Sequence, residues 1–275
     1  MKKIMITLLL GAAILAAWIW IRSSRAEVGT IVQTPLAATT SSAPNKRNQT
    51  DSNAVIGTKN IEIKSQDFSK DYEYLKANAE RDAAYAYAFA LELLECEKLE
   101  SSYEAVADVN ALSKISKDTT RAMLESVEKN DKKCNGLSAE KIALYSDLVD
   151  FAARSGVIEA QLNYSTILAG TINAKDAIES PEKIIEYKKK SVDYLNRAAV
   201  AGDSRALLHL GLAYDDGILV KKDPETAYKY LYAYSLSSPN ARVHSLLSQV
   251  ESQLTISQIG SSQKEGSLLY SSCCR

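Results

Sequence analysis

Small and hydrophobic residues recur in a fixed phrase along the second half of the chain. Residues 147–160 read DLVDFAARSGVIEA, and residues 193–206 read DYLNRAAVAGDSRA, 46 positions later (193 minus 147). In both copies an apolar helical face leads to two alanines, a glycine and a further alanine. Such a repeated helix–turn–helix unit predicts stacked α-hairpins, because each hairpin buries its apolar face against its neighbours.

The matched small residues predict close packing and the end of a helix. Alanine lets a neighbouring helix approach closely, and glycine readily adopts the left-handed conformation that ends a helix. Asp203 is a good N-cap for the helix that follows in the later copy. The matched pairs are Ala152 and Ala198, Gly156 and Gly202, and Ala160 and Ala206.

Helical spacing continues into the stretch LLHLGLAYDDGILVKKDPETAYKYLYAYS. Its first helix carries apolar and small residues on successive turns and stops at a glycine. An Asp-Pro pair then restarts a helix, with the aspartate as N-cap and proline at the first position. The positions that carry this prediction are Leu210, Gly211, Tyr214, Gly217, Asp223, Ala227 and Ala233.

With Ala206, these residues resemble the A-x3-LG-x2-Y-x2-G…D-x3-A…A pattern of Sel-one-like repeats, a variant of tetratricopeptide-like helical repeats. The resemblance is strong over 203–238 and fair over 147–202. A degenerate copy occupies 72–91, in which Ala77 takes the place of Ala152 and Arg81 takes that of Gly156. The resemblance implies an all-α fold, an α-α superhelix or solenoid of antiparallel hairpins with a concave face. It also implies a scaffold or adaptor, often at bacterial envelopes, without a catalytic group.

Apolar periodicity predicts ten helices and no strand. We expect a helical repeat domain over 65–255 and a disordered Ser-rich tail over 256–275. The predicted helices span 68–79, 82–98, 101–116, 118–130, 138–155, 157–170, 181–201, 203–215, 224–237 and 240–255.

The N-terminus carries an uncharged stretch over 4–21, preceded by two lysines. Eighteen helical residues span about 27 Å, close to the hydrocarbon thickness of a bilayer. Trp18 and Trp20 suit the far interface. Two interpretations compete: a retained transmembrane anchor over 1–26, or a signal peptide cleaved after Ala26. The length of the run and its two tryptophans favour the anchor.

A linker over 27–64 follows, rich in Thr, Ser, Ala, Asn and Pro, and its composition is typical of a flexible tether. The two N-terminal lysines and the short leading segment favour an exported body. We therefore expect a bacterial inner-membrane protein with its repeat domain in the periplasm, or a periplasmic protein if cleaved. The net charge of −1 gives no electrostatic argument for nucleic acid.

Four cysteines are present, and export makes their oxidation available. Cys96 ends an apolar helix and Cys134 lies in a turn, so we predict a disulfide between them; two unpaired thiols are the alternative. Cys273 and Cys274 lie in the Ser-rich tail, where they cross-link chains or have no role, since adjacent cysteines seldom bridge. The chain has no CxxC spacing, so no redox motif, metal site or cofactor is predicted.

Catalytic signatures are missing from the sequence. The two histidines, His209 and His244, lie inside predicted helices without metal-ligand partners at helical spacing. There is no Gly-x-Ser-x-Gly turn and no glycine-rich phosphate loop. Some cysteine-rich relatives of these repeats are associated with cell-wall or β-lactam processing. Their regular cysteine pair in each repeat is missing here, and we do not predict an enzyme.

Tyrosines alternate along the helix predicted at 224–237. Tyr230 and Tyr234 match packing positions of the repeat family, whereas Tyr228 and Tyr232 share another face. We expect the latter pair to be exposed, since exposed tyrosine is favoured at interfaces; partial burial is the alternative. The same question arises in the first hairpin, so the candidate partner-binding residues are Tyr228, Tyr232, Tyr85 and Tyr87.

The sequence thus predicts a membrane-tethered, exported and non-enzymatic solenoid that binds a protein partner. Its concave face would take a peptide or a helix. Two alternatives stay open: a structural component of an envelope or secretion complex, and an enzyme related to cell-wall or β-lactam hydrolases.

Overall fold

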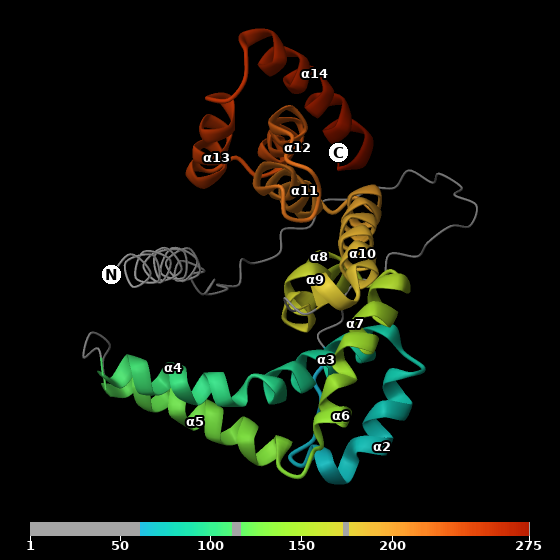
Figure 1. Cartoon of the computed structure of the whole chain (residues 1–275), viewed down its shortest axis with the longest axis vertical. Coiled ribbons are helices and arrows are strands. Elements are labelled where there is room, and N and C mark those ends of the chain that lie inside the picture. Colours follow the sequence, from blue (N-terminus) through green and yellow to red (C-terminus); the bar gives the residue numbers. More distant parts are fainter. Residues whose placement is uncertain (1–60, 112–116, 173–175, 275) are drawn as a thin grey trace, which may run out of the picture. The chain divides into compact units, whose positions relative to one another are not determined.

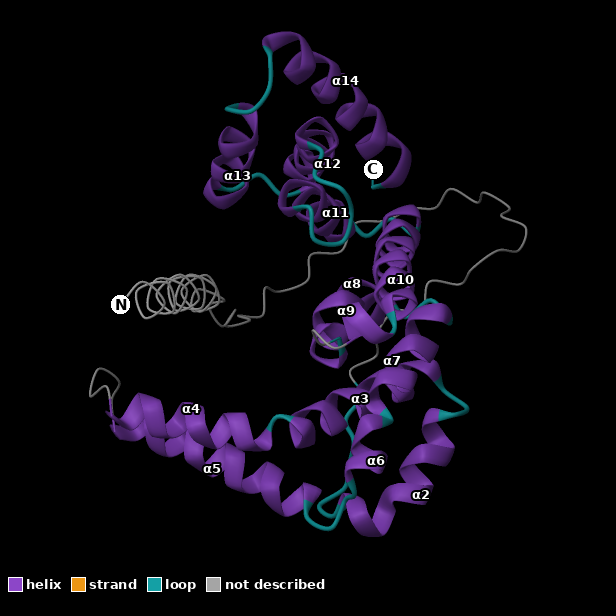
Figure 2. Ribbon diagram, viewed as in Figure 1, coloured by secondary structure: helices purple, strands orange, loops and turns teal. Residues whose placement is uncertain are grey.

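The computed structural model describes residues 61–111, 117–172 and 176–274, all within the unit Ser52–Arg275 (Figure 1). These residues form helices and loops, with no strand among them, so the predicted all-α class is confirmed (Figure 2). The predicted anchor over 1–26 and residues 27–60 of the linker predicted over 27–64 lie outside the described residues. Of the remaining linker residues, Ile63 is buried in the core. Within the described ranges, no helix is both long and apolar enough to cross a bilayer.

Thirteen α-helices and one 3-10 turn are described. Their bounds are α2 Phe68–Ala79, α3 Ala83–Glu97, α4 Leu99–Ala111, α5 Lys117–Cys134, α6 Ala139–Ala143, α7 Tyr145–Arg154, α8 Ile158–Leu168, η1 Ala169–Thr171, α9 Asp176–Glu179, α10 Pro181–Val200, α11 Arg205–Asp216, α12 Pro224–Ser237, α13 Ala241–Glu251 and α14 Ile256–Cys273. Two predicted helices, 68–79 and 224–237, have the observed bounds. The predicted helix 138–155 is instead two helices, α6 and α7, which meet at Leu144.

Aromatic packing organises the first group of helices. Phe89 of α3 is fully buried, and the rings of Phe68 and Tyr72 of α2 meet it edge-on at 6.1 and 6.2 Å between centroids. Asp82 caps α3 by accepting hydrogen bonds from the backbone of the next turn. Helix α3 packs on α2, α6 and α7, and it is therefore the centre of this group.

Helices α4 and α5 lie side by side between the two cysteines predicted to bridge (Figure 1). The sulfur atoms of Cys96 and Cys134 are 1.95 Å apart, and both residues are buried. Next to them, Lys133 of α5 forms an ion pair with Glu92 of α3 at 2.6 Å and lies 4.9 Å from the centre of the Phe68 ring. Three contacts therefore attach the base of this hairpin to α2 and α3.

The repeated small residues lie at helix ends and helix contacts. Gly156 and Gly202 follow α7 and α10 with φ of 92° and 96°, which is left-handed backbone that favours glycine. Gly211 lies where α11 meets α12: a Cβ added there would be 2.7 Å from Cγ of Leu231. The remaining alanines of the repeat phrase are fully buried or nearly so: Ala152, Ala160, Ala198, Ala206, Ala227 and Ala233.

The prediction of a disordered tail over 256–275 is wrong. Residues Ile256–Cys273 form α14, which packs along α12, so the helical domain extends beyond residue 255. Ser262 donates a hydrogen bond to the carbonyl of Glu225 at 3.3 Å, and a Cβ added to Gly266 would lie 2.7 Å from the carbonyl oxygen of Lys229. The small residues that suggested low complexity therefore permit close contact between two helices.

Candidate functional site

The expected exposure of Tyr228 is also wrong. Its side chain is 1 % exposed, and its hydroxyl donates to Glu251 of α13 at 2.5 Å and accepts from Gln263 of α14 at 3.1 Å. Tyr232, half-buried, stacks on it with ring centres 6.2 Å apart. Helices α13 and α14 cover this face of α12, so Tyr228 joins three helices and is not available to a partner.

Replacing Tyr228 with Phe is expected to lower the free energy of unfolding by about 1–2 kcal/mol, because Gln263 and Glu251 lose a buried partner. Burial, and then the hydrogen bond to Glu251, raise the pKa of Tyr228 to about 12. The raised pKa means that this stabilisation is complete below pH of about 10 and is lost as the pH rises toward 12. Urea unfolding measures the change. The matched variant Tyr74→Phe, at a side chain 71 % exposed, should change stability by less than about 0.5 kcal/mol.

Of the four candidate tyrosines, Tyr87 is the one that lines a hollow of the surface. It is 8 % exposed, and its hydroxyl accepts a hydrogen bond from Asn163 of α8 at 3.1 Å. Burial raises its pKa, and the carboxylate of Glu159 adds to the shift. Tyr85, two positions before Tyr87, is half-buried against the core and does not line that hollow.

This hollow, which we call the α3 groove, has a volume of about 830 Å³. Its floor is one face of α3, where residues recur at intervals of three and four: Ala84, Tyr87, Ala88, Leu91, Glu92 and Glu95. The rest of the lining comes from the segment 61–63, from Lys129, Asn130 and Lys133 of α5, and from Glu159 of α8. Its volume is in the range of protein ligand clefts.

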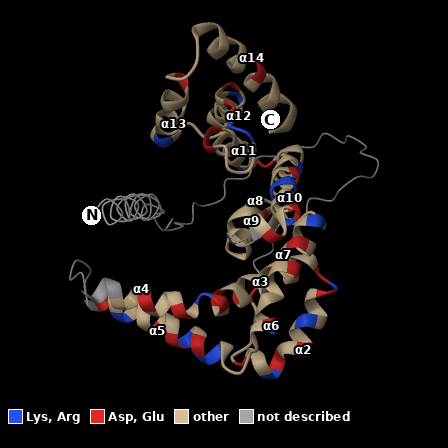
Figure 3. Cartoon of the chain, in the orientation of Figure 1, with Lys and Arg blue, Asp and Glu red and all other residues tan. Residues whose placement is uncertain are grey.

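Charge in the α3 groove is mainly negative: its lining holds four glutamates and two lysines. Lys133 is already paired with Glu92, and Glu159 pairs with Arg205 at 2.7 Å. Glu62 and Glu95 are exposed and have no ion-pair partner in the described part of the chain. Acidic residues continue into α4, where they are drawn red in Figure 3.

A second hollow of about 270 Å³ lies between α4 and α5. Its lining is largely apolar or small, with Leu99, Ala105 and Val106 from α4 and Met123 and Val127 from α5. It shares Glu95 and Asn130 with the α3 groove, so the two hollows are neighbours.

Outside the two hollows, the described residues offer few side chains that could bind a metal or act in catalysis. No three His, Cys, Asp or Glu side chains there are placed to hold a metal ion. His209 lies partly buried in α11, where burial, and then the nearby guanidinium of Arg205, lower its pKa. His209 is therefore neutral at pH 7, and its side chain makes no hydrogen bond to another described residue.

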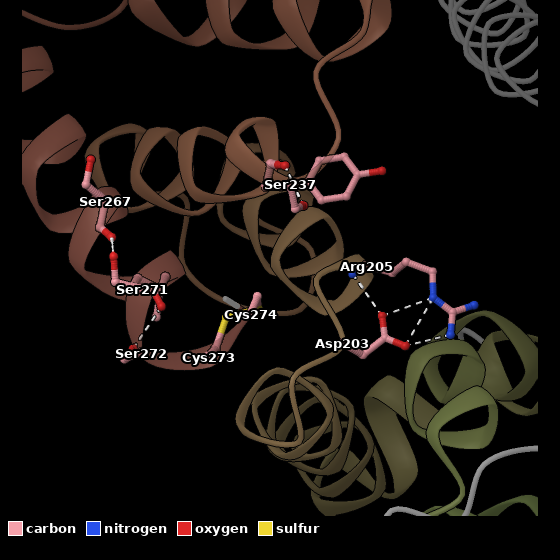
Figure 4. The surroundings of a disulfide bond; sticks show 10 residues. Asp203, Arg205, Ser237, Ser267, Ser271, Ser272, Cys273 and Cys274 are labelled. Carbon is pink, nitrogen blue, oxygen red and sulfur yellow. Dashed lines mark hydrogen bonds and ion pairs between the residues drawn. A yellow bond between two sulfur atoms is a disulfide. The ribbon is translucent and has the colours of Figure 1, made fainter. Parts of the chain in front are cut away.

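The two C-terminal cysteines differ from expectation. The sulfur atoms of Cys273 and Cys274 lie 1.98 Å apart, although adjacent cysteines seldom bridge (Figure 4). Both residues pack beside the buried cluster of α10, α11 and α12. The carbonyl oxygen of Cys273 lies 3.3 Å from the place of a Cβ on Gly202, so the end of α14 contacts the turn after α10.

No family model matches this chain, and no curated protein matches it. Among solved structures, it is similar to the crystal structure of a protective antigen present in uropathogenic Escherichia coli strains and displaying an SLR fold. The two sequences are 16% identical, the match covers 76% of this chain and 50% of that one, and the TM-score is 0.30. The match thus spans half the length of that antigen. A TM-score of this size carries no argument about fold or function.

Proposed function

We propose that this chain is a non-enzymatic scaffold of Sel-one-like helical repeats that binds a segment of another protein in the α3 groove. The observation that carries the proposal is the groove itself. Its floor includes Ala84, Ala88 and Leu91, which the described helices leave half-buried or exposed. Leu91 is a large apolar side chain that is 37 % exposed at this site. Covering it with a partner removes apolar surface from water, which favours association.

The way the floor is held supports a binding role. Phe89 and Leu93 on the opposite side of α3 are fully buried in the core, and the α5 wall is attached through Lys133. A surface fixed in this way loses little conformational entropy on binding. The repeat-like packing of α11 on α12 through Gly211 supports the proposed family.

Export and tethering form part of the proposal. The apolar run at 4–21 suits a membrane anchor, and the linker over 27–64 would let the helical domain stand away from the inner membrane in the periplasm. A disulfide between Cys96 and Cys134 suits that oxidising compartment, and their sulfur atoms are at bonding distance.

Crosslinking in membranes of cells that produce the full chain tests the proposal. Three versions are compared: the natural chain, Ala88→Gln and Ala122→Gln. Ala88 lies on the groove floor, whereas Ala122 is an exposed mid-helix residue of α5 outside both hollows. We expect the natural chain and Ala122→Gln to capture the same heterologous protein, and Ala88→Gln to lose it, because the longer side chain occupies the floor.

Equal capture by all three versions would overturn the groove as the binding site. Crosslinks between copies of this chain alone would favour a structural role in an envelope or secretion complex over an adaptor. Thermal unfolding of each purified variant shows whether the substitution leaves the fold intact.

A further inference from the structure

We infer that the α3 groove takes a short, basic amphipathic helix of the partner. This inference rests on the proposed function, because it names the chemistry of the segment that the groove would bind. It follows from the backbone of the groove, the spacing of its floor residues and its unpaired charges.

The backbone around the groove favours a helical ligand. The floor is α3 and one wall is α5, so the backbone N–H and C=O groups there are already used in helical hydrogen bonds. An extended peptide laid on α3 and α5 would find no backbone partner on either helix, and only segment 61–63 of the lining is not helical. A helix satisfies its own backbone and presents only side chains to the floor.

The floor is shaped for a second helix. Ala84 and Ala88 lie four positions apart on one face of α3, and the next turn carries Leu91. Side chains of a partner helix can lie over the alanines, as ridges of one helix fit the grooves of another. The eleven steps from Ala84 to Glu95 correspond to about 16 Å, which accommodates about three turns. The matching face therefore carries apolar residues at positions i, i+3 or i+4, and i+7.

The unpaired charges of the groove favour basic residues on both sides of the apolar face of that helix. Of the two lysines in the lining, Lys133 is neutralised by Glu92, which leaves Lys129. Against it stand two exposed carboxylates without ion-pair partners among the described residues, Glu62 and Glu95. This field attracts a cationic ligand and repels an anionic one.

Fluorescence anisotropy with a designed probe tests the inference. The probe is a labelled helical peptide of about 12 residues with Leu and Ala on one face and Lys on both flanks. The matched peptide has Glu in place of each Lys. We expect the basic peptide to bind the full chain, to bind more weakly as salt is raised, and to bind at least about fivefold more tightly than the acidic peptide.

Charge reversal locates the binding. The double variant Glu62→Lys/Glu95→Lys is expected to weaken binding of the basic peptide by about fivefold to tenfold. Glu97→Lys/Glu100→Lys makes the same change of charge on neighbouring exposed residues that do not line the groove, and should leave binding nearly unchanged. Equal binding of the two peptides, or equal effects of the two double variants, would overturn the inference.

The outcomes separate this inference from the function on which it rests. If Ala88→Gln abolishes capture of the cellular partner while the basic peptide fails to bind, the chemistry inferred here is wrong and the groove is still the binding site. If Ala88→Gln leaves both capture and peptide binding unchanged, the groove is not the site and both proposals fail.

Discussion

Replacing both Cys96 and Cys134 with alanine is expected to lower the free energy of unfolding by roughly 3–4 kcal/mol, because the disulfide between them restricts the unfolded chain. The bond closes a loop of 38 positions, and that loop contains α4 and α5. Without the disulfide, the unfolded chain regains the conformational entropy that the bond had removed. Alanine is the suitable replacement because both sites are buried, where a serine hydroxyl would need a partner.

The measurement is made in a background that lacks the C-terminal pair. In the variant Cys273→Ala/Cys274→Ala, a reducing agent acts on a single bridge. We expect reductant to lower the denaturant midpoint of this protein and to leave the midpoint of the four-alanine protein unchanged. Recovery of Cys96 and Cys134 as free thiols from cells, or an unchanged midpoint on reduction, contradicts the prediction.

Gly266→Ala and Gly260→Ala are expected to shift stability in opposite directions, although both substitutions lie in α14. A Cβ at position 266 would lie 2.7 Å from the backbone carbonyl oxygen of Lys229, so α14 must move away from α12. We expect a net loss of about 1–2 kcal/mol, because the overpacking outweighs the gain in helix propensity. At position 260 nothing lies within 4 Å of the added atom, and a gain of up to about 1 kcal/mol is expected.

Urea unfolding of the two variants beside the natural chain measures this difference, which is about 1–3 kcal/mol. The pair also tests whether the last helix is docked. If the segment were detached from α12, neither alanine would meet a neighbour, and the two variants would behave alike. Equal changes in the two midpoints would therefore contradict the packing of α14.

Local turn chemistry and the small residues of the repeat phrase could be predicted from the sequence. Gly156 and Gly202 end helices with left-handed backbone, and Asp223 caps α12 by accepting from the backbone N–H of Thr226. Each of these features depends on a few neighbouring residues. Gly211 was predictable for a different reason, since its place in the LG pair matches a close helix contact of the repeat pattern.

The burial of Tyr228 could not be predicted, because it depends on elements that follow the repeat pattern. The periodicity of α12 shows which residues share a face, but not that α13 and α14 cover the face that carries Tyr228. The tail was misinterpreted for a related reason. Serine and glycine are frequent in disordered segments and also at close helix contacts, and only the position of α12 distinguishes the two cases.

The candidate groove was missed because its lining comes from segments far apart in the chain. Segment 61–63, α3, α5 and α8 each contribute to it. One signal was present in the sequence: Ala84, Ala88 and Leu91 recur at intervals of four and three along α3. That spacing alone does not tell an open face from a buried one, since Ala86, Phe89 and Ala90 on the same helix are fully buried.

Cys96 and Cys134 are the immediate chain neighbours of Glu95 and Lys133, which belong to the floor and the wall of the α3 groove. Oxidation of the two thiols would therefore fix the spacing of the recognition surface as well as stabilise the hairpin. Reduction of the two thiols would remove this constraint. The distance between the two sides of the groove would then depend on the redox state of its surroundings.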